Sequence, residues 1–506
     1  MPSLFLLVLL IATLAFAPVA RADGRTPLTP ALSPEERGGS SWHSSSADNG
    51  DHPRGSLSPL GRGEGEGPRN PLPEALLAQA AVEDPFADIA KTAAAKAPRK
   101  SPLSFWIREE AAYRTTSPED WSKIKTVGYL SVSQRLSEAI KFKVSGRGYY
   151  DAVFDAVDTY PKAVKDDQQK EADLRETFVD VSLGDFDARL GKQTVVWGEA
   201  VGLFFADVVN AKDLREFVLP DFDYIRTPQW MADLSYQIGP VRVEAVWIPV
   251  LDFNRFAKTG GEFAYALPPL PAGTEVVLND TKEPDNKTKN SDGGGRLSFL
   301  VSGWDIGLFH FYAWDRFPTY FRTVDVNPAT GGPRVTFDPE HTRIKQTGLT
   351  VSKSVDPVVL RAEFVYAQDR YFPVSDLTTP RGVLKKDSLD ALIGLSYTPS
   401  RYLDTNIQIF ERVILSHEDN LVDPKYDSSA SLQLVGRLLD GKVKPEILGI
   451  TSLRRNDHMV RPRISYFPAD SWRLTLGYDL FGGVETGLFG QFGTKDRVYA
   501  EVQYTY

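Results

Sequence analysis

Charged side chains crowd one stretch of the chain, residues 189–236, where they are interspersed with large apolar residues. Carboxylate and guanidinium groups at this density can set the electric field through which an ion or a polar solute moves. They can equally pair with one another and hold the stretch in one folded conformation. Together with charged positions on other segments, the candidate residues are Arg189, Lys192, Gln193, Trp197, Glu199, Asp213, Arg215, Glu216, Asp221, Asp223, Arg226, Arg242, Glu244, Arg361 and Glu363. Because both signs of charge occur, we predict a field across a passage rather than a filter for one sign of ion.

Enzymatic chemistry finds little support in the sequence. The six histidines are scattered, with no H-E-x-x-H pair, and no G-x-S-x-G nucleophile elbow occurs. The chain has no cysteine, which excludes a cysteine nucleophile, a thiolate metal site and haem attached through C-x-x-C-H. Residues 279–295 carry carboxylates, but their spacing misses the EF-hand pattern, so a solvated loop is the better interpretation. We expect no catalytic residue, metal ion or cofactor, although a hydrolase whose Ser, His and Asp come from separate strands stays open.

Length and charge narrow the class of protein further. The 506 residues are enough for two or three ordinary domains or for a single large β-barrel. The net charge is -9, and the chain has no basic run. This balance argues against binding to nucleic acid, because phosphates require clustered positive charge.

The first residues predict export. An apolar run over residues 4–16 is followed by the small-residue motif A-R-A, so residues 1–22 are interpreted as a signal peptide. No Lys or Arg precedes the run, and a short membrane anchor is the alternative. Residues 23–100 are rich in Gly, Pro, Ser and charge, which predicts a disordered, low-complexity segment, with a short helix within residues 84–100.

Alternation of apolar and polar residues dominates the rest of the chain, residues 101–506, in segments of about ten residues. In the segment "LRAEF" at residues 360–364, for example, the apolar Leu, Ala and Phe alternate with Arg and Glu. Successive side chains of a β-strand point to opposite faces, so each segment predicts a strand with one apolar and one charged face. The predicted fold class is therefore all-β, and residues 101–506 are predicted to form one barrel.

The connections between these segments alternate in length. Tight turns such as residues 184–185 are followed by long polar connections such as residues 198–228 and 251–295. Outer-membrane barrels have this pattern, because their periplasmic turns are short and their extracellular loops are long. We predict a transmembrane antiparallel β-barrel of about 18 strands, or of 16 if the segments interrupted by Pro445 and Pro462 fail to form strands. A soluble sandwich or propeller is the alternative, but neither Greek-key spacing nor blade repeats occur.

The charged stretch lies between the fifth and sixth predicted strands, which makes it the third extracellular connection. By fold-level analogy with general porins, we expect this connection to fold into the lumen and narrow it, with Trp197 anchoring its start. The residues Phe204, Phe205 and Phe217 could instead line an apolar passage.

The chain ends in a strictly alternating segment, Val498 to Tyr506, whose last residue is aromatic. Such an ending resembles the C-terminal signal that the barrel insertion machinery reads, and it would place Tyr506 in the periplasmic aromatic girdle. We predict location in the outer membrane of a Gram-negative bacterium, in contact with outer-membrane lipid. A homo-oligomer is left open, because no flat patch on the lipid-facing side decides it.

A motif within the charged stretch carries a family resemblance. A strand ends in G-K-Q-x-x-x-W-G-E, and a segment containing D-V-V-N-A-K-D-L-R-E-F follows. This pattern resembles a family of proteobacterial outer-membrane proteins of unknown function. The matching residues are Gly191, Lys192, Gln193, Trp197, Gly198, Glu199, Asp207, Asn210, Asp213, Leu214, Arg215 and Pro228. The resemblance is specific over this stretch and loose over the rest of the barrel; it implies a porin-like barrel and brings no substrate.

The function favoured by these observations is passive passage of solutes through a channel with a charged lumen and a constricting inner loop. Two other transport functions stay open: a specific channel for hydrophobic compounds, and an export pore that works with periplasmic partners. A barrel that forms a sheath for a redox partner and a barrel hydrolase are further alternatives. The solute itself is not identified by the sequence.

Overall fold

The structure is a computed structural model, and it describes residues 101–198, 206–266, 270 and 272–506. Several predictions from the sequence lie outside the described residues, namely the signal peptide at 1–22, the low-complexity segment with its helix at 23–100, and the roles of Glu199, Phe204 and Phe205.

The alternation of apolar and charged residues produces strands, because each strand can then present its apolar side chains to one face and its charged side chains to the other. In chain order, the strands of the main sheet are β1 (Leu103–Arg114), β2 (Asp120–Arg135), β3 (Ile140–Asp151), β4 (Lys170–Leu183), β5 (Phe186–Gln193), β8 (Gln229–Ile238), β9 (Val241–Ile248), β12 (Asp292–Val301), β13 (Trp304–Trp314), β16 (Arg343–Val355), β17 (Val358–Pro373), β18 (Val383–Ser400), β19 (Leu403–Ile414), β20 (Tyr426–Gly436), β21 (Val443–Ser452), β22 (Asp457–Ala469), β23 (Trp472–Gly483) and β24 (Arg497–Thr505).

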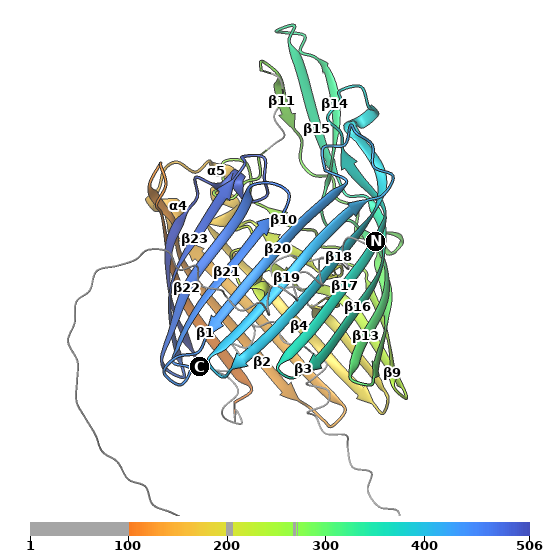
Figure 1. Cartoon of the computed structure of the whole chain (residues 1–506), viewed down its shortest axis with the longest axis vertical. Coiled ribbons are helices and arrows are strands. Elements are labelled where there is room, and N and C mark those ends of the chain that lie inside the picture. The colour runs from red at the N-terminus through yellow and green to blue at the C-terminus, as the bar shows by residue number, and fades with distance from the viewer. Residues whose placement is uncertain (1–100, 199–205, 267–269, 271) are drawn as a thin grey trace, which may run out of the picture. The chain divides into compact units, whose positions relative to one another are not determined.

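The main sheet is an 18-stranded antiparallel barrel that closes on itself (Figure 1). Each of its strands pairs with the next one in chain order, and β24 pairs with β1, where Val502 lies opposite Glu109. Closure leaves the barrel without a free sheet edge. The predicted all-β barrel of about 18 strands is confirmed, and the smaller count of 16 is wrong.

The two prolines that made the strand count uncertain lie where a ladder of hydrogen bonds is incomplete on one side. Pro445 lies just beyond the end of the β20–β21 ladder. Pro462 lies in a gap of the β22–β23 ladder, between the pairs formed by Val460 and Arg463. Proline has no N–H to donate, so a strand accommodates it at a position where the neighbouring strand on that side needs no hydrogen bond from it.

Short and long connections lie at opposite rims of the barrel (Figure 1). The short connections include residues 184–185, 239–240, 302–303, 356–357, 401–402 and 470–471. The long connections are residues 152–169, 194–228, 249–291, 315–342, 374–382, 415–425 and 484–496. The C-terminus lies at the rim of the short connections (Figure 1). The alternation in length that the sequence predicted is therefore present.

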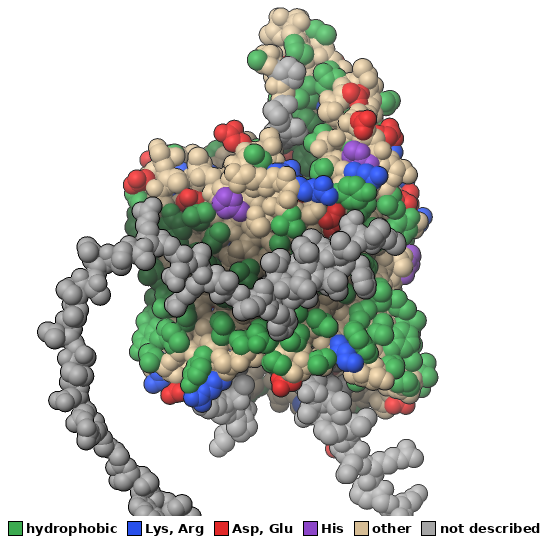
Figure 2. Space-filling model, viewed as in Figure 1, with side chains coloured by type: hydrophobic (Ala, Val, Ile, Leu, Met, Phe, Trp, Pro, Cys, Tyr) green, Lys and Arg blue, Asp and Glu red, His purple; other side chains and the backbone are tan. Residues whose placement is uncertain are grey.

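The outer face of the barrel is largely apolar, and polar and charged side chains gather on the inner face. On β24, Val498 and Val502 are exposed, whereas Arg497 and Gln503 on the other face are buried inside the barrel. Figure 2 shows hydrophobic side chains over the visible outer wall and charged side chains toward the two rims. Within the described part of the chain, no helix is both long and apolar enough to cross a membrane.

The long connections hold the remaining elements, which are short. They are α4 (Val153–Ala156), α5 (Lys162–Gln168), β6 (Ala211–Leu214), α6 (Phe222–Ile225), β7 (Arg226–Thr227), β10 (Arg255–Phe256), β11 (Glu275–Leu278), η1 (Thr288–Asn290), β14 (Thr319–Val326), β15 (Pro333–Glu340), η2 (Pro380–Gly382) and η3 (Gly490–Phe492). Strands β11, β14 and β15 form a separate three-stranded sheet that projects beyond the rim of the long connections (Figure 1).

Candidate functional site

The connection between β5 and β8, residues 194–228, starts by packing against the inner face of the wall. Trp197 is fully buried in an apolar cluster with side chains from β8, β9, β13 and β17. Its ring centroid lies 5.2 Å from that of Phe309 and 5.7 Å from that of Phe311. Its indole Nε1 donates a hydrogen bond of 2.9 Å to Glu244 Oε1 on β9. Trp197 is thus bound to the wall by packing and by a hydrogen bond to a charged acceptor.

A close backbone approach beside Trp197 requires glycine. A Cβ atom built on Gly198 would lie 2.8 Å from the Cβ of Ala206 and 2.9 Å from its carbonyl carbon. Contacts this short do not occur between real side chains, so any other residue would force the two parts of the connection apart.

Buried polar groups tie the two ends of the connection together. The side chain of Asn210 accepts a hydrogen bond from the backbone N–H of Val195 at 3.1 Å and donates one to the carbonyl of Val195 at 2.6 Å. Arg226 Nε donates to Asp207 Oδ2 at 2.8 Å. Burial alone would raise the pKa of the Asp207 carboxyl, but the charges of Lys212 and Arg226 outweigh it and hold the pKa below its ordinary value. The carboxylate is therefore ionised at neutral pH and keeps these contacts.

The middle of the connection packs against a different part of the inner wall. Phe217 and Leu219 are buried in a cluster with Leu448 and Ile450 of β21, and with side chains from β22, β23 and two other long connections. The centroid of the Phe217 ring lies 6.2 Å from that of Phe481 on β23. Residues 194–228 are thus bound to the wall at two places, one on β8, β9, β13 and β17 and the other on β21 to β23.

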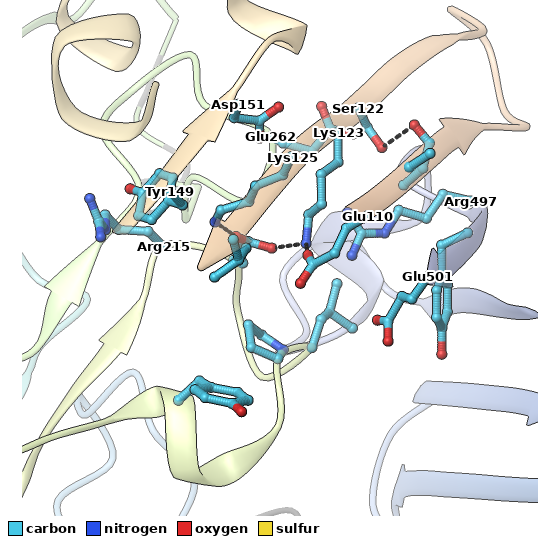
Figure 3. Close-up of a pocket in the computed structure, with 18 of the residues that line it drawn as sticks. Glu110, Ser122, Lys123, Lys125, Tyr149, Asp151, Arg215, Glu262, Arg497 and Glu501 are labelled. Carbon is cyan, nitrogen blue, oxygen red and sulfur yellow. Dashed lines mark hydrogen bonds and ion pairs between the residues drawn. The ribbon is translucent and has the colours of Figure 1, made fainter. Parts of the chain in front are cut away.

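Ion pairs add to the second attachment. Glu216 pairs with Lys123 and Lys125 of β2, and Lys125 Nζ donates to its carboxylate at 2.6 Å. Figure 3 shows both lysines pointing from β2 into the cavity, with Lys123 beside Glu110. Burial would raise the pKa of the Glu216 carboxyl, but the two lysines outweigh it and hold the pKa well below its ordinary value.

Asp221 forms a second bridge to the wall. Its carboxylate lies 3.5 Å from Arg108 Nη1 on β1 and 3.7 Å from Arg463 Nη1 on β22. Burial would raise the pKa of the Asp221 carboxyl, but the charges of Arg473, Arg463 and Arg108 hold it below its ordinary value. Carboxylates of the connection therefore face wall cations on both sides of the junction between β24 and β1.

Arg215 completes the ionic contacts of the connection. Its guanidinium donates to Asp213 Oδ2 and to Glu171 Oε2, both at 2.6 Å. Burial would raise the pKa of the Asp213 carboxyl, but hydrogen bonding to Arg215 and its charge hold it below its ordinary value. Both charges are satisfied within the structure, so this pair holds the connection in place.

A cavity that is open to solvent lies between this connection and the wall formed by β1, β2, β3, β22, β23 and β24. Its charged lining includes Lys and Arg side chains in the same number as Asp and Glu side chains. Figure 3 shows Tyr149, Asp151 and Arg215 on one side of the cavity and Arg497 and Glu501 on another. The cavity is strongly polar, and its charged lining has no excess of one sign.

Several predicted site residues lie on the inner face but outside this cavity. Arg189 pairs with Asp180 at 2.5 Å on β4, and its guanidinium lies 4.3 Å from the centroid of the Phe178 ring. Arg242 lies 3.6 Å from Asp187. Gln193 is fully buried and donates to the carbonyls of Arg189 and Met231, so it supports the strand end.

Lys192 lies on the outer face of the barrel, which contradicts its prediction as a channel-lining residue. It lies opposite Trp230, whose ring is exposed on the outer wall, whereas its neighbours Arg189 and Gln193 face inward. Period-2 alternation along β5 already puts Lys192 and Arg189 on opposite faces. Lys192 was predicted to line the channel because it belongs to the G-K-Q motif. The alternation of faces along the strand could have excluded it from the channel-lining residues.

Arg361 and Glu363 lie on the inner face of β17, as predicted, but away from the main cavity. They line a small polar pocket with Arg296 and Thr350, and Arg361 Nη1 donates to Ser396 Oγ at 2.6 Å. Asp223 has a largely exposed side chain that lies 3.8 Å from Arg226. Glu199 lies outside the described residues.

The cavity also contains charged residues that the sequence reasoning did not select. They include Arg108, Glu110, Lys123, Lys125, Arg461, Arg463 and Asp479. Each occupies the polar face of its alternating segment, so the signal was present, but nothing in the sequence indicates which wall strands the connection reaches. Among the described residues, no group of His, Cys, Asp and Glu is arranged to hold a metal ion.

Comparisons with known proteins identify a family and leave the function open. A family model described as a protein of unknown function, DUF1302, matches residues 122–430. No curated protein matches the sequence. Among solved structures, OccAB1 of Acinetobacter baumannii aligns with a TM-score of 0.47 at 9% identity, over 81% of this chain and 98% of that one. The outer membrane protein OpdK of Pseudomonas aeruginosa aligns with a TM-score of 0.45 at 7% identity, over 80% and 98%. OmpF of Salmonella typhi, in complex with daunomycin, aligns with a TM-score of 0.38 at 10% identity, over 80% and 97%.

Proposed function

The chain belongs to the DUF1302 family of proteins of unknown function, and because that membership brings no activity with it, we propose a function from the geometry: a porin-like channel of the outer membrane that lets solutes pass passively. The observation that supports this most directly is a closed barrel with an apolar outer face and an inner face rich in charge. An inner face of this kind is suited to water and polar solutes.

The connection 194–228 is the part of the channel that restricts passage. Its attachment at two separate places on the inner wall supports a path across the lumen, because the strands of the two apolar clusters lie far apart around the sheet. The charged groups of Glu216 and Asp221 then stand between the clusters and face β1, β2 and β22. A solute has to pass beside these groups, through the open cavity.

Selectivity comes from the field across that cavity. Cations and carboxylates line it in equal number, which disfavours exclusion of one sign of ion. A transverse field orients dipolar solutes and admits small ions of both signs. A channel for hydrophobic compounds is less well supported, because Phe217 is buried against Phe481 and Phe492 and presents no surface to a solute.

Planar-bilayer recording tests the proposal. Purified protein should give discrete conductance steps, and a variant that lacks residues 202–222 should give larger steps, because it loses the middle of the connection. A wild-type barrel that conducts no ions would contradict the channel. Equal conductance of the two proteins would place the restriction elsewhere in the barrel.

A further inference from the structure

The charges that line the open cavity are separated between the barrel wall and the long connections. Among the described lining residues, the wall strands contribute seven cations and four carboxylates, whereas the connections contribute one cation and four carboxylates. The carboxylates of the connections are Asp213, Glu216, Asp221 and Glu262. The wall side of the cavity therefore attracts anions.

Asp221 is held on the wall more loosely than Glu216 is. Its oxygens lie 3.5 Å from Arg108 Nη1 and 3.7 Å from Arg463 Nη1, which is longer than an ordinary hydrogen bond. By comparison, Glu216 accepts a hydrogen bond of 2.6 Å from Lys125. Asp221 also begins α6 without a side-chain hydrogen bond to that helix, and 25% of its side chain is exposed. Attraction between charges holds Asp221 in place, so another carboxylate can replace it.

The two guanidinium groups that face Asp221 are fixed by carboxylates of the wall. Arg463 Nε and Nη2 both lie 2.9 Å from Glu446 Oε2, which leaves Nη1 facing Asp221. Arg108 Nε lies 2.6 Å from Glu110 Oε1, and its Nη1 also faces Asp221. Each guanidinium thus presents one nitrogen to one oxygen of the same carboxylate, an arrangement that suits a planar carboxylate group.

Tyr499 of β24 adds a hydrogen-bond donor to this part of the wall. Its side chain lines the cavity and is 8% exposed, and among the described residues its hydroxyl has no hydrogen-bond partner. Gly477 lies between Tyr499 and Arg463 in the sheet, and a Cβ atom on Gly477 would lie 2.5 Å from the Tyr499 hydroxyl. The phenol therefore extends across β23 toward Arg463. A buried hydroxyl without a partner is unfavourable, and an acceptor brought by a solute removes that cost.

We propose that the cavity contains a binding site for the carboxylate group of a solute, formed by Arg108, Arg463 and Tyr499, and that Asp221 occupies this site when no solute is bound. A solute carboxylate replaces Asp221 at the two guanidinium groups and accepts a hydrogen bond from the Tyr499 hydroxyl, which Asp221 does not. The inference rests on the proposed function, because it names the class of solute that the channel takes. Binding at the site can nevertheless be measured without any conduction.

Calorimetric titration of the full-length, detergent-solubilised protein measures this binding. The probes are butyrate and butyramide, which has nearly the same shape and no charge. Wild-type protein should bind butyrate about tenfold more tightly than butyramide. Asp221→Asn should tighten butyrate binding about tenfold, because it removes a tethered competitor of high effective concentration. Asp166→Asn, which removes an exposed carboxylate from α5, is the matched control and should leave the affinity unchanged.

A second variant tests the hydroxyl without altering the connection. Tyr499→Phe keeps the ring and should weaken butyrate binding about fivefold, because the carboxylate loses one hydrogen bond. Its matched control is Tyr478→Phe, which removes a phenol hydroxyl beside the exposed Val498 on the outer face and should leave butyrate binding unchanged.

Three results would each overturn the proposal: equal affinity of the wild type for butyrate and butyramide, no tightening by Asp221→Asn, or no weakening by Tyr499→Phe. Bilayer recording on the same samples separates the site from the channel function. A protein that binds butyrate but conducts no ions retains the site and contradicts the channel. A protein that conducts but does not distinguish butyrate from butyramide retains the channel and contradicts the site.

Discussion

Trp197 of the long connection and Glu244 of the wall are joined by a hydrogen bond of 2.9 Å, from the indole Nε1 to the carboxylate Oε1. It joins the start of residues 194–228 to β9, beside the apolar cluster that buries the Trp197 ring. Hydrogen bonds to charged acceptors contribute about 1.5–3 kcal/mol when they are protected from water. The position of the connection inside the barrel should therefore be sensitive to this one contact.

Trp197→Phe removes the indole N–H but keeps an aromatic ring. We expect the connection to open locally more often, so that trypsin cleaves after Lys212 about ten times faster or more in the intact barrel, in proportion to a loss of at least 1.4 kcal/mol. Trp230→Phe, on the exposed outer face, is the matched control and should leave the rate unchanged. Equal cleavage rates in the two variants would show that packing alone holds the connection.

Glu216→Gln removes the charge that faces Lys123 and Lys125 while keeping the shape of the side chain. Removing one partner of a buried ion pair costs about 3–5 kcal/mol, and this partly buried pair should cost less, because water reaches the remaining charges. The middle of the connection should loosen, and single-channel conductance should rise. Asp166→Asn is the control, since it removes the same charge from an exposed pair with Lys162 on α5. A conductance that changes equally in both variants would point to a general effect of charge.

Acid should open the channel. The carboxyls of Asp207, Glu216 and Asp221 have pKa values below their ordinary ones, since cations of the connection or wall outweigh the effect of burial. Groups with a lowered folded-state pKa stabilise the fold above the unfolded pKa, about 4, and that stabilisation is lost as the pH falls through the folded value. Conductance should thus be constant from pH 7 to about pH 4 and increase below it. A decrease below pH 4 would show that protonation closes the lumen.

Arg189→Gln should shift ion selectivity toward cations. Arg189 is partly exposed on the inner face, and its removal leaves Asp180 of β4 without its main partner. We expect the cation-to-anion permeability ratio, obtained from the reversal potential in a salt gradient, to rise about twofold. Lys192→Gln is the control, because it removes a positive charge only three residues away on the outer face. An equal shift in both variants would mean that selectivity follows total charge rather than lumen charge.

Much of the barrel could be predicted from the sequence because alternation is a local property. Residues 360–364 face the two sides as their types predict, with Leu360 exposed on the outer wall and Glu363 buried within. The long third connection also followed from the order of the segments, whereas the role of Trp197 as the anchor of a constricting loop stays a prediction. Lys192 shows that a motif alone does not identify lumen-facing residues. Neighbouring residues of the G-K-Q motif point to opposite faces of β5, so Gln193 faces inward and Lys192 faces outward.

The sequence by itself determined which side chains face outward and which face the lumen, because successive residues of a strand point to opposite faces whatever the strand pairs with. Only the tertiary structure decided which charges meet. Glu216 contacts Lys123 and Lys125, and Asp221 contacts Arg108 and Arg463, because pairing of β24 with β1 brings the first and last strands of the barrel to one part of the wall. These ion pairs depend on which wall strands the long connection reaches inside the closed barrel. A local pattern of residues cannot predict this, because the strands are far apart in the sequence.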